Sequence, residues 1–168
     1  MRPNQSLYDS RAFFLIALRV AIGWHFLYEG LVKLFTPSWT ASGYLLDSKG
    51  LLAPMFKGIA ASPGMLRFVD SLNEWGLILI GAGLILGLLT RPAIIGGMVL
   101  LTFYYLSHPP LVIFNYSLPS EGSYFIVDKI MIEFIALGVL YTFRTELVVG
   151  IDRLLFRNKA YMPDDGKG

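Results

Sequence analysis

The chain has 168 residues, of which 55% are hydrophobic and 15% are charged, and its mean hydropathy is +0.58. This apolar content is well above that of an ordinary soluble domain and predicts an all-α integral membrane protein. The sequence contains no cysteine, which excludes disulfides within the chain, cysteine-ligated iron–sulfur centres and a thiol relay. Its net charge of +2 includes no dense basic run, so nucleic acid is not an expected partner.

Four segments are long and apolar enough to cross a hydrocarbon core of about 30 Å, which takes about 20 helical residues. They cover approximately residues 12–35, 72–90, 92–112 and 124–144. We therefore expect a four-transmembrane-helix bundle within residues 1–155, followed by a polar cytoplasmic tail at 156–168 that has too few apolar groups to fold. Only residues 90–92 separate the second and third helices, which predicts a tight antiparallel hairpin.

The long loop between the first two membrane helices, at about 36–71, is rich in apolar residues that glycines and prolines interrupt. Because so much apolar surface is unfavourable in water, we expect short helices at about 51–61 and 63–71. They would lie in the outer membrane interface or cap the bundle. The sequence leaves open whether this loop only stabilises the bundle or covers a substrate site.

Lysine and arginine residues divide unequally between the two sides of the predicted bundle. One side has Arg2, Arg11, Arg91, Arg144, Arg153, Arg157, Lys159 and Lys167, and the other has Lys49, Lys57 and Arg67. The positive-inside rule then predicts cytoplasmic N- and C-termini in the inner (plasma) membrane. The N-terminal residues show no apolar stretch followed by a cleavage site, so no removable signal peptide is expected.

The first predicted membrane helix carries four polar groups, Arg19, His25, Glu29 and Lys33, within one bilayer-length segment. At about 100° per residue they share a sector of roughly 120°, and the rest of the helix is apolar. Glu29 precedes Lys33 by four residues, the favourable order for a helical ion pair. His25 and Glu29 have the same spacing, so the carboxylate could orient the imidazole.

Polar groups on the other helices are expected at similar depths, counted at 1.5 Å per residue from the cytoplasmic side. Arg19 would lie about 12 Å in, Glu133 about 17 Å, His25 about 21 Å, Lys129 about 22 Å, Glu74 and His108 about 25 Å, and Glu29 about 27 Å. We predict a polar, partly hydrated cavity, open to the outside. The candidate catalytic residues are His25, Glu29 and Glu133, and the candidate quinone- or substrate-binding residues are Arg19, Lys33, Glu74, His108 and Lys129.

Other interpretations of these residues remain open. The charges could form a purely structural ion-pair network, Lys33 and Lys129 could extend to the interface, and Glu74 could simply flank its helix. Two histidines would permit a bis-imidazole haem, but the two prolines after His108 leave its direction undefined, so haem is disfavoured. A metal site is not expected, because ion pairs explain the carboxylates equally well.

Several stretches resemble the DoxX family, and within it the DoxD-like small membrane subunit of thiosulfate:quinone oxidoreductases. The stretches are "LRVAIGWHFLYEGLVKL" at 18–34, "PSWTASGYLLDSKGLLAPMF" at 37–56, "EWGLILIGAGLILGLLTRPA" at 74–93 and "VVGIDRLL" at 148–155. The resemblance implies a four-helix membrane protein, often paired with another subunit, that donates electrons to the quinone pool. The family's patterned polar residues fall on Arg19, Glu29, Lys33, Glu74, Arg91, Glu133 and Asp152.

The leading hypothesis is therefore a membrane subunit of a quinone-linked oxidoreductase, passing electrons from thiosulfate or another external reductant to quinone. His25 and Glu29 would handle protons, and Arg19 or Lys33 would offset negative charge. Its expected partners are the lipid membrane, quinone, and another redox subunit or further copies of the chain. The alternatives are a non-catalytic assembly or anchoring subunit and, less favoured, a small-solute transporter.

Overall fold

The structure is a computed structural model that describes residues 3–111, 113–117 and 125–156. Within these residues every regular element is a helix. The elements are α1 (Pro3–Phe35), α2 (Ser42–Leu46), α3 (Ala53–Ala61), α4 (Pro63–Leu86), α5 (Thr90–Ser107), α6 (Lys129–Thr142), the short 3-10 helix η1 (Thr145–Leu147) and α7 (Ile151–Phe156). The predicted all-α character is confirmed for the described part of the chain.

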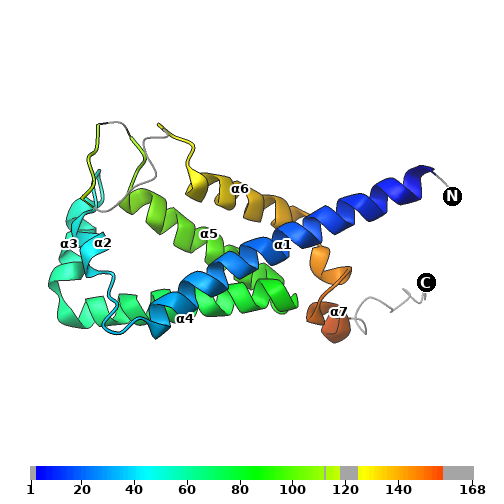
Figure 1. Cartoon of the computed structure of the whole chain (residues 1–168), viewed down its shortest axis with the longest axis horizontal. Coiled ribbons are helices and arrows are strands. Elements are labelled where there is room, and N and C mark those ends of the chain that lie inside the picture. The colour runs from blue at the N-terminus through cyan, green and yellow to red at the C-terminus, as the bar shows by residue number, and fades with distance from the viewer. Residues whose placement is uncertain (1–2, 112, 118–124, 157–168) are drawn as a thin grey trace, which may run out of the picture.

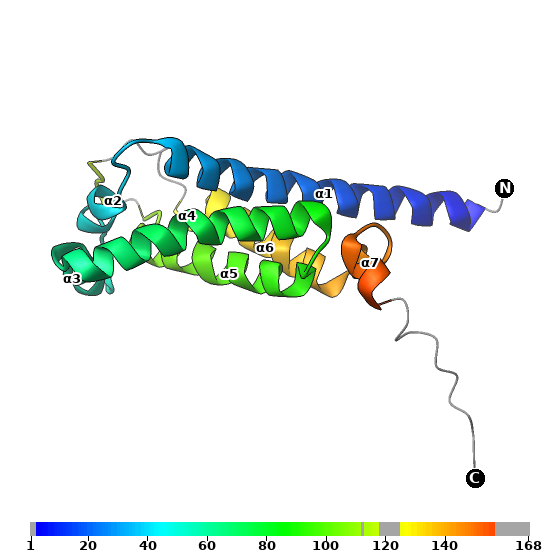
Figure 2. The ribbon, with the colours of Figure 1, turned by 90° about the horizontal axis from the view of Figure 1, so that it is seen from below.

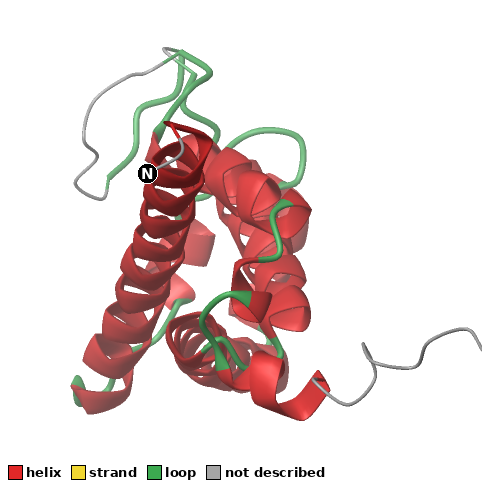
Figure 3. Ribbon diagram, turned by 90° about the vertical axis from the view of Figure 1, so that its right-hand side faces the viewer, coloured by secondary structure: helices red, strands yellow, loops and turns green. Residues whose placement is uncertain are grey.

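The four longer helices α1, α4, α5 and α6 lie lengthwise beside one another, and the shorter helices lie at the two ends (Figure 1). Helices α2 and α3 lie at one end, whereas the turn between α4 and α5 lies with α7 at the other (Figure 2). Figure 3 looks along the bundle from this second end, where α1 begins. Helix α1 extends past its neighbours there (Figures 1 and 2).

Several helix boundaries differ from the sequence-based expectation. Helix α1 begins at Pro3 rather than near residue 12, and the short helix α2 was not predicted. The expected short helix at 63–71 is the first part of α4, since Pro63 occupies a first-turn position and no breaker follows before Gly87. Helix α5 ends at Ser107, because the prolines after His108 cannot continue it. Helix α6 begins later than expected, at Lys129, where the Asp128 carboxylate accepts a hydrogen bond from the Met131 amide at 2.9 Å.

The expected tight hairpin between the second and third long helices is present. Gly87 ends α4 in the left-handed conformation, with φ of 62°, and Leu89 also has a positive φ, of 50°. Leu88 donates its amide to the Gly83 carbonyl at 2.9 Å, which satisfies a carbonyl in the last turn of α4. Two residues in left-handed conformations reverse the chain, and Pro92 lies in the first turn of α5.

Glycines bring α1 and α4 into backbone contact, and this is the most extensive helix pairing in the fold. An ideal Cβ at Gly81 would lie 2.6 Å from the Gly23 carbonyl oxygen and closer still to the Leu27 amide nitrogen. A Cβ at Gly30 would lie 2.7 Å from a side-chain carbon of Ile78. Small residues at helix contacts allow this approach in membranes as well as in water.

Two groups of buried apolar residues form the interior. The larger one joins the four long helices and consists of Ile22, Phe26, Leu77, Ile80, Leu84, Ala93, Ile94, Leu101, Leu137 and Leu140. The smaller one, Ala41, Leu45 and Phe56, packs the region of α2 and α3 against the start of α4. The long loop is therefore folded onto the bundle by its own apolar residues; its placement in a membrane interface stays a prediction.

Two helical segments, Ser10–Phe35 and Pro63–Leu86, are long and apolar enough to cross a membrane by length and composition. Helices α5 and α6 have 18 and 14 residues, which at 1.5 Å per residue gives about 27 Å and 21 Å. All four expose large apolar side chains: Phe14 is 70% exposed, Leu79 67%, Phe103 51% and Ile132 60%. Such surfaces favour contact with lipid.

Candidate functional site

The polar residues of the four long helices form three separate groups rather than one cavity wall. The first lies where α1 passes the C-terminal segment. Arg19 is 1% exposed; its Nη2 donates to the Val149 carbonyl at 2.6 Å and its Nη1 donates to the Thr145 hydroxyl at 3.3 Å. The carboxylates of Glu146 and Asp152 act on the Arg19 charge. Arg19 therefore joins α1 to the chain that follows α6.

Asp152 ties the same segment to the hairpin between α4 and α5. Its carboxylate accepts hydrogen bonds from the amides of Leu89 at 2.9 Å and Thr90 at 3.0 Å, where α5 begins. Its own amide donates to the Gly87 carbonyl at 2.8 Å. A negative charge at a helix N-terminus is favourable, because free amides converge there. We call the set of Arg19, Thr145, Val149, Asp152 and the Leu89–Thr90 amides the end clamp.

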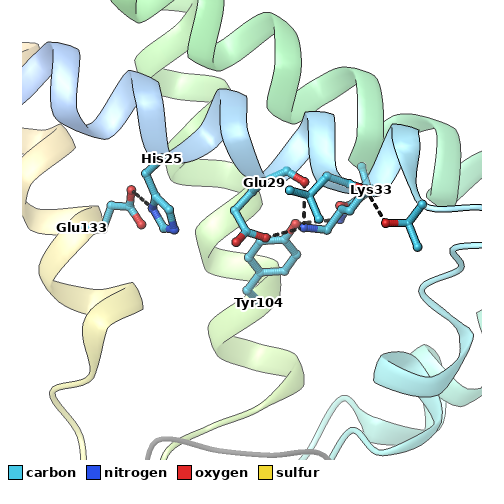
Figure 4. A network of polar contacts seen from close by, with 8 residues as sticks. His25, Glu29, Lys33, Tyr104 and Glu133 are labelled. Atoms are coloured by element: carbon cyan, nitrogen blue, oxygen red, sulfur yellow. Dashed lines mark hydrogen bonds and ion pairs between the residues drawn. The ribbon is translucent and has the colours of Figure 1, made fainter.

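The second group joins α1 to α6 through His25 and Glu133 (Figure 4). The His25 Nδ1 and the Glu133 Oε1 lie 2.9 Å apart. The His25 side chain is 53% exposed and the Glu133 side chain 14%. Because an ionised carboxylate only accepts, Nδ1 carries the hydrogen and Nε2 is left for a second partner. The prediction that the Glu29 carboxylate orients His25 is wrong. The carboxylate that bonds to the imidazole belongs to Glu133, 108 positions away in the chain.

Glu29 and Lys33 extend this second group along α1. The Lys33 Nζ lies 2.7 Å from the Glu29 Oε2, as the sequence spacing predicts, and 5.6 Å from the centre of the Trp39 ring. Tyr104 of α5 points toward these two residues (Figure 4). Its hydroxyl accepts a hydrogen bond from the Asn73 Nδ2 at 2.7 Å. The second group thus contains His25, Glu29, Lys33, Glu133 and the Asn73–Tyr104 pair.

The third group surrounds His108 at the C-terminal end of α5. The imidazole stacks between Tyr44 and Tyr116, with ring centres 3.8 Å and 4.7 Å away, and its Nδ1 shares a hydrogen bond with Ser107 at 3.1 Å. Its Nε2 is buried and has no hydrogen-bond partner among the described residues. Both faces of the ring are covered, so His108 belongs to a packed aromatic stack at the end of the bundle.

Acid is expected to destabilise the folded chain through His108. Burial lowers the pKa of His108; Asp47 opposes this shift and Lys49 reinforces it. The unfolded chain then binds the proton more readily, so the stability that neutral His108 contributes is complete above about pH 6.5 and is lost as the pH falls through the folded-state pKa. The measurement is the free energy of unfolding by denaturant titration between pH 8 and 5. In His108→Phe this free energy should fall less steeply with decreasing pH, by up to about 1.4 kcal/mol per pH unit.

The matched control for this measurement is His25→Phe, which removes the other histidine and leaves the stack unchanged. A His108→Phe protein with the same pH dependence as the unsubstituted chain would show that the acid sensitivity has another source.

The remaining candidates are placed less specifically. Glu74 lies on α4 where α1 crosses, and its backbone carbonyl is 3.0 Å from the position a Gly30 Cβ would take. Lys129 is the first residue of α6, and its charge acts on both His25 and Glu29. The structure therefore brings Lys129 toward the second group, whereas Arg19 and His108 lie in groups of their own. Within the described residues no three metal-ligating side chains gather.

Several residues of these groups have no signal in the sequence. Asn73 and the stacking partners Tyr44 and Tyr116 carry no spacing signal that would connect them to Tyr104 or His108. Thr145 and Val149 contribute one hydroxyl and one backbone carbonyl to Arg19, and a backbone carbonyl has no signature in the sequence. Asp152 was named only through the family resemblance. The usual local signal for a helix cap is a polar or acidic residue directly before the helix. Here the carboxylate that caps α5 comes from Asp152, 62 positions away from Thr90.

Compared with family models, with curated proteins and with solved structures, the chain matches none. The resemblance to the DoxX family therefore stays a prediction, and the functional argument depends on the geometry of the described residues.

Proposed function

We propose that the chain is a membrane subunit of a quinone-linked oxidoreductase, with His25 and Glu133 managing protons at the quinone ring. The observation that carries the proposal is the 2.9 Å contact between these side chains, which joins two apolar helices while 53% of the His25 side chain stays exposed. Ionisable side chains in an apolar membrane segment are costly and rare, and they commonly mark a functional site. Quinones dissolve in lipid, so a half-exposed imidazole on such a helix is accessible to them.

The chemistry follows from the arrangement of the pair. Reduction of a quinone to a quinol consumes two electrons and two protons. Nε2 of His25 can supply a proton to a quinone oxygen, while Glu133 at Nδ1 stabilises the protonated imidazole and fixes its orientation. Glu29 and Lys33 lie one and two turns further along α1 and place both signs of charge nearby. Protons are then replaced from the water side.

Electrons enter from another molecule, since the sequence contains no cysteine that could relay them. We propose an external reductant such as thiosulfate, acting directly or through a partner redox subunit or a second copy of the chain. Lys49, which lies between α2 and α3 and 3.8 Å from the Asp47 carboxylate, would contribute positive charge for an anionic donor at that end of the bundle.

We also propose that α1, α4, α5 and α6 each cross the plasma membrane, with both termini in the cytoplasm and with α2 and α3 outside. The start of α1, the turn between α4 and α5, and α7 share one end of the bundle, which supports an even number of passes (Figure 2). Arg91, in the first turn of α5, and Arg144, between α6 and η1, lie at this same end. The excess of cations there favours the cytoplasmic side.

A second candidate function, a non-catalytic assembly or anchoring subunit, is favoured by the end clamp. Arg19 is a buried charge whose Nη1 and Nη2 both donate to the chain that follows α6, although its Nε has no partner among the described residues. These two bonds give Arg19 a structural role in joining α1 to that segment. If the second group is equally structural, the ion pairs between and along the helices fix helix register, and the chemistry belongs to a partner.

The test is quinone reduction by the purified protein, with and without co-purifying partners, with thiosulfate as donor and a short-tailed ubiquinone as acceptor. His25→Asn and Glu133→Gln are expected to lower kcat by about 100-fold or more, the usual size of general acid–base catalysis. Arg11→Gln, an exposed change near the start of α1 at the opposite end of the bundle, is the control and should keep full turnover.

Circular dichroism and thermal unfolding must show that the variants remain folded. Equal turnover in His25→Asn and the unsubstituted protein would reject the proton-handling role. A stable complex without quinone reduction in any preparation would support the assembly subunit instead.

A further inference from the structure

Tyr104 is held beside the second group by contacts from two other helices. Its hydroxyl accepts a hydrogen bond from the Asn73 Nδ2 of α4 at 2.7 Å. Its backbone carbonyl accepts one from the Tyr44 hydroxyl at 3.3 Å, and the Tyr44 ring meets the Tyr104 ring edge-on, with centres 6.0 Å apart. The Tyr104 side chain is therefore fixed in position at both its ring and its hydroxyl.

The hydrogen bonds around the Tyr104 hydroxyl leave one donor unused. A phenol has a single hydrogen and also accepts, and the Asn73 amide occupies the accepting side. The Tyr104 hydrogen is then available for a further acceptor. The Oδ1 of Asn73 is itself buried without a partner among the described residues, so the pair is incompletely satisfied. Buried polar atoms without partners are uncommon and call for an explanation.

The Tyr104 hydroxyl lies beside α1, near enough to Glu29 for that carboxylate to act on it. Figure 4 shows the Tyr104 ring next to Glu29 and Lys33, on the same side of α1 as His25. Lys33 already engages Glu29 at 2.7 Å, so the two charged groups neutralise each other without Tyr104. His25 and Glu29 are four positions apart on α1, which is about 6 Å along the helix axis.

We propose that Tyr104 is a ligand-binding residue that donates its hydroxyl hydrogen to a carbonyl oxygen of a para-quinone. This inference rests on the proposed function and deepens it: His25 meets one oxygen of the ring, and Tyr104, about one helical turn further along, meets the oxygen on the opposite side. Asn73 is a positioning residue, because it orients the phenol without touching the ligand. Two donors at opposite oxygens select para-quinones over apolar ligands of similar size.

The experiment measures binding, independently of turnover. A short-tailed ubiquinone is titrated into the full chain in detergent micelles, with the dissociation constant taken from tryptophan fluorescence and the carbonyl stretching bands of the bound quinone from infrared difference spectra. Tyr104→Phe keeps the ring and removes only the donor. It should weaken binding about three- to tenfold, the effect of one hydrogen bond, and move one of the two carbonyl bands toward its frequency in free quinone.

Tyr105→Phe is the matched control, since Tyr105 is the adjacent residue of α5 and its hydroxyl is already bonded to the Ile126 carbonyl at 2.8 Å. It should change neither the affinity nor the carbonyl bands. Asn73→Ala keeps the phenol but removes the hydrogen bond that orients it, so a smaller loss of quinone affinity is expected. This variant decides the matter if Tyr104→Phe does not fold.

The outcomes separate the two proposals. If the unsubstituted chain binds the quinone and Tyr104→Phe binds it equally, with both carbonyl bands unmoved, the role of Tyr104 is overturned and the proposed function stands. If the unsubstituted chain binds no quinone, the proposed function fails, and the binding role fails with it.

Discussion

Gly81→Ala is expected to destabilise the protein by about 3 kcal/mol or more, because the added methyl group has no space between α4 and α1. Its Cβ would lie 2.6 Å from the Gly23 carbonyl oxygen and 2.7 Å from the Leu27 Cα. Both are backbone atoms, which cannot rotate away as a side chain can. The two helices would have to separate, and their separation would disturb the largest helix contact in the fold.

The measurement is the free energy of unfolding in mixed micelles, with the substitution Gly138→Ala as the matched control. Gly138 lies within α6, and a Cβ there meets nothing within 4 Å among the described residues. Replacing a helical glycine by alanine without a clash should stabilise the helix by about 0.5–1 kcal/mol. Gly81→Ala with unchanged stability would show that α1 and α4 are not in backbone contact.

Asp152→Ala is expected to cost about 2–4 kcal/mol, because it leaves two backbone amides without their acceptor and removes negative charge near the buried Arg19. The amides of Leu89 and Thr90 lose their shared acceptor at the start of α5. Arg19, 1% exposed, loses one of the two carboxylates that act on its charge. Removing one member of a buried ionic group typically costs several kcal/mol, since the other is left uncompensated.

A double-mutant cycle separates these two causes. Arg19→Met removes the charge and keeps a side chain of comparable length, so Arg19→Met combined with Asp152→Ala should cost clearly less than the sum of the single changes. Arg153→Met is the control: Arg153 is exposed in the same segment and donates to the Val148 carbonyl at 3.1 Å, so its loss should change stability by less than about 0.5 kcal/mol. Additive effects of Arg19→Met and Asp152→Ala would mean that the end clamp is two independent contacts.

Helix positions were largely predictable, and helix ends were less so. The apolar runs place four long helices where the structure has α1, α4, α5 and α6, because local composition decides that a segment is helical. The merger of residues 63–71 into α4 was missed, since Pro63 and Gly64 suggest a break although both are tolerated in a first turn. The late start of α6 depends on the Asp128 cap, which an apolar pattern does not reveal.

The candidate site was predictable only where its residues are close in sequence. The Glu29–Lys33 ion pair follows directly from their spacing on one helix. Periodicity also placed His25 on the same face as Glu29, yet the bond of His25 goes to Glu133 on α6. Residues 112 and 118–124 lie outside the described residues, and they include the predicted end of the third membrane helix and start of the fourth. Residues 157–168, nearly all of the predicted polar tail, also lie outside them.

The sequence by itself determined that the chain is helical and strongly apolar, and that one face of α1 carries ionisable residues. These properties follow from composition and from the 3.6-residue period, which act within a single helix. Only the tertiary structure decided which charges meet. Arg19 shared its face with His25 in the sequence, but it binds Thr145, 126 positions away, at the end of the bundle. Contacts of this kind depend on how helices pack, and helix packing here depends on where glycines such as Gly81 let two backbones approach.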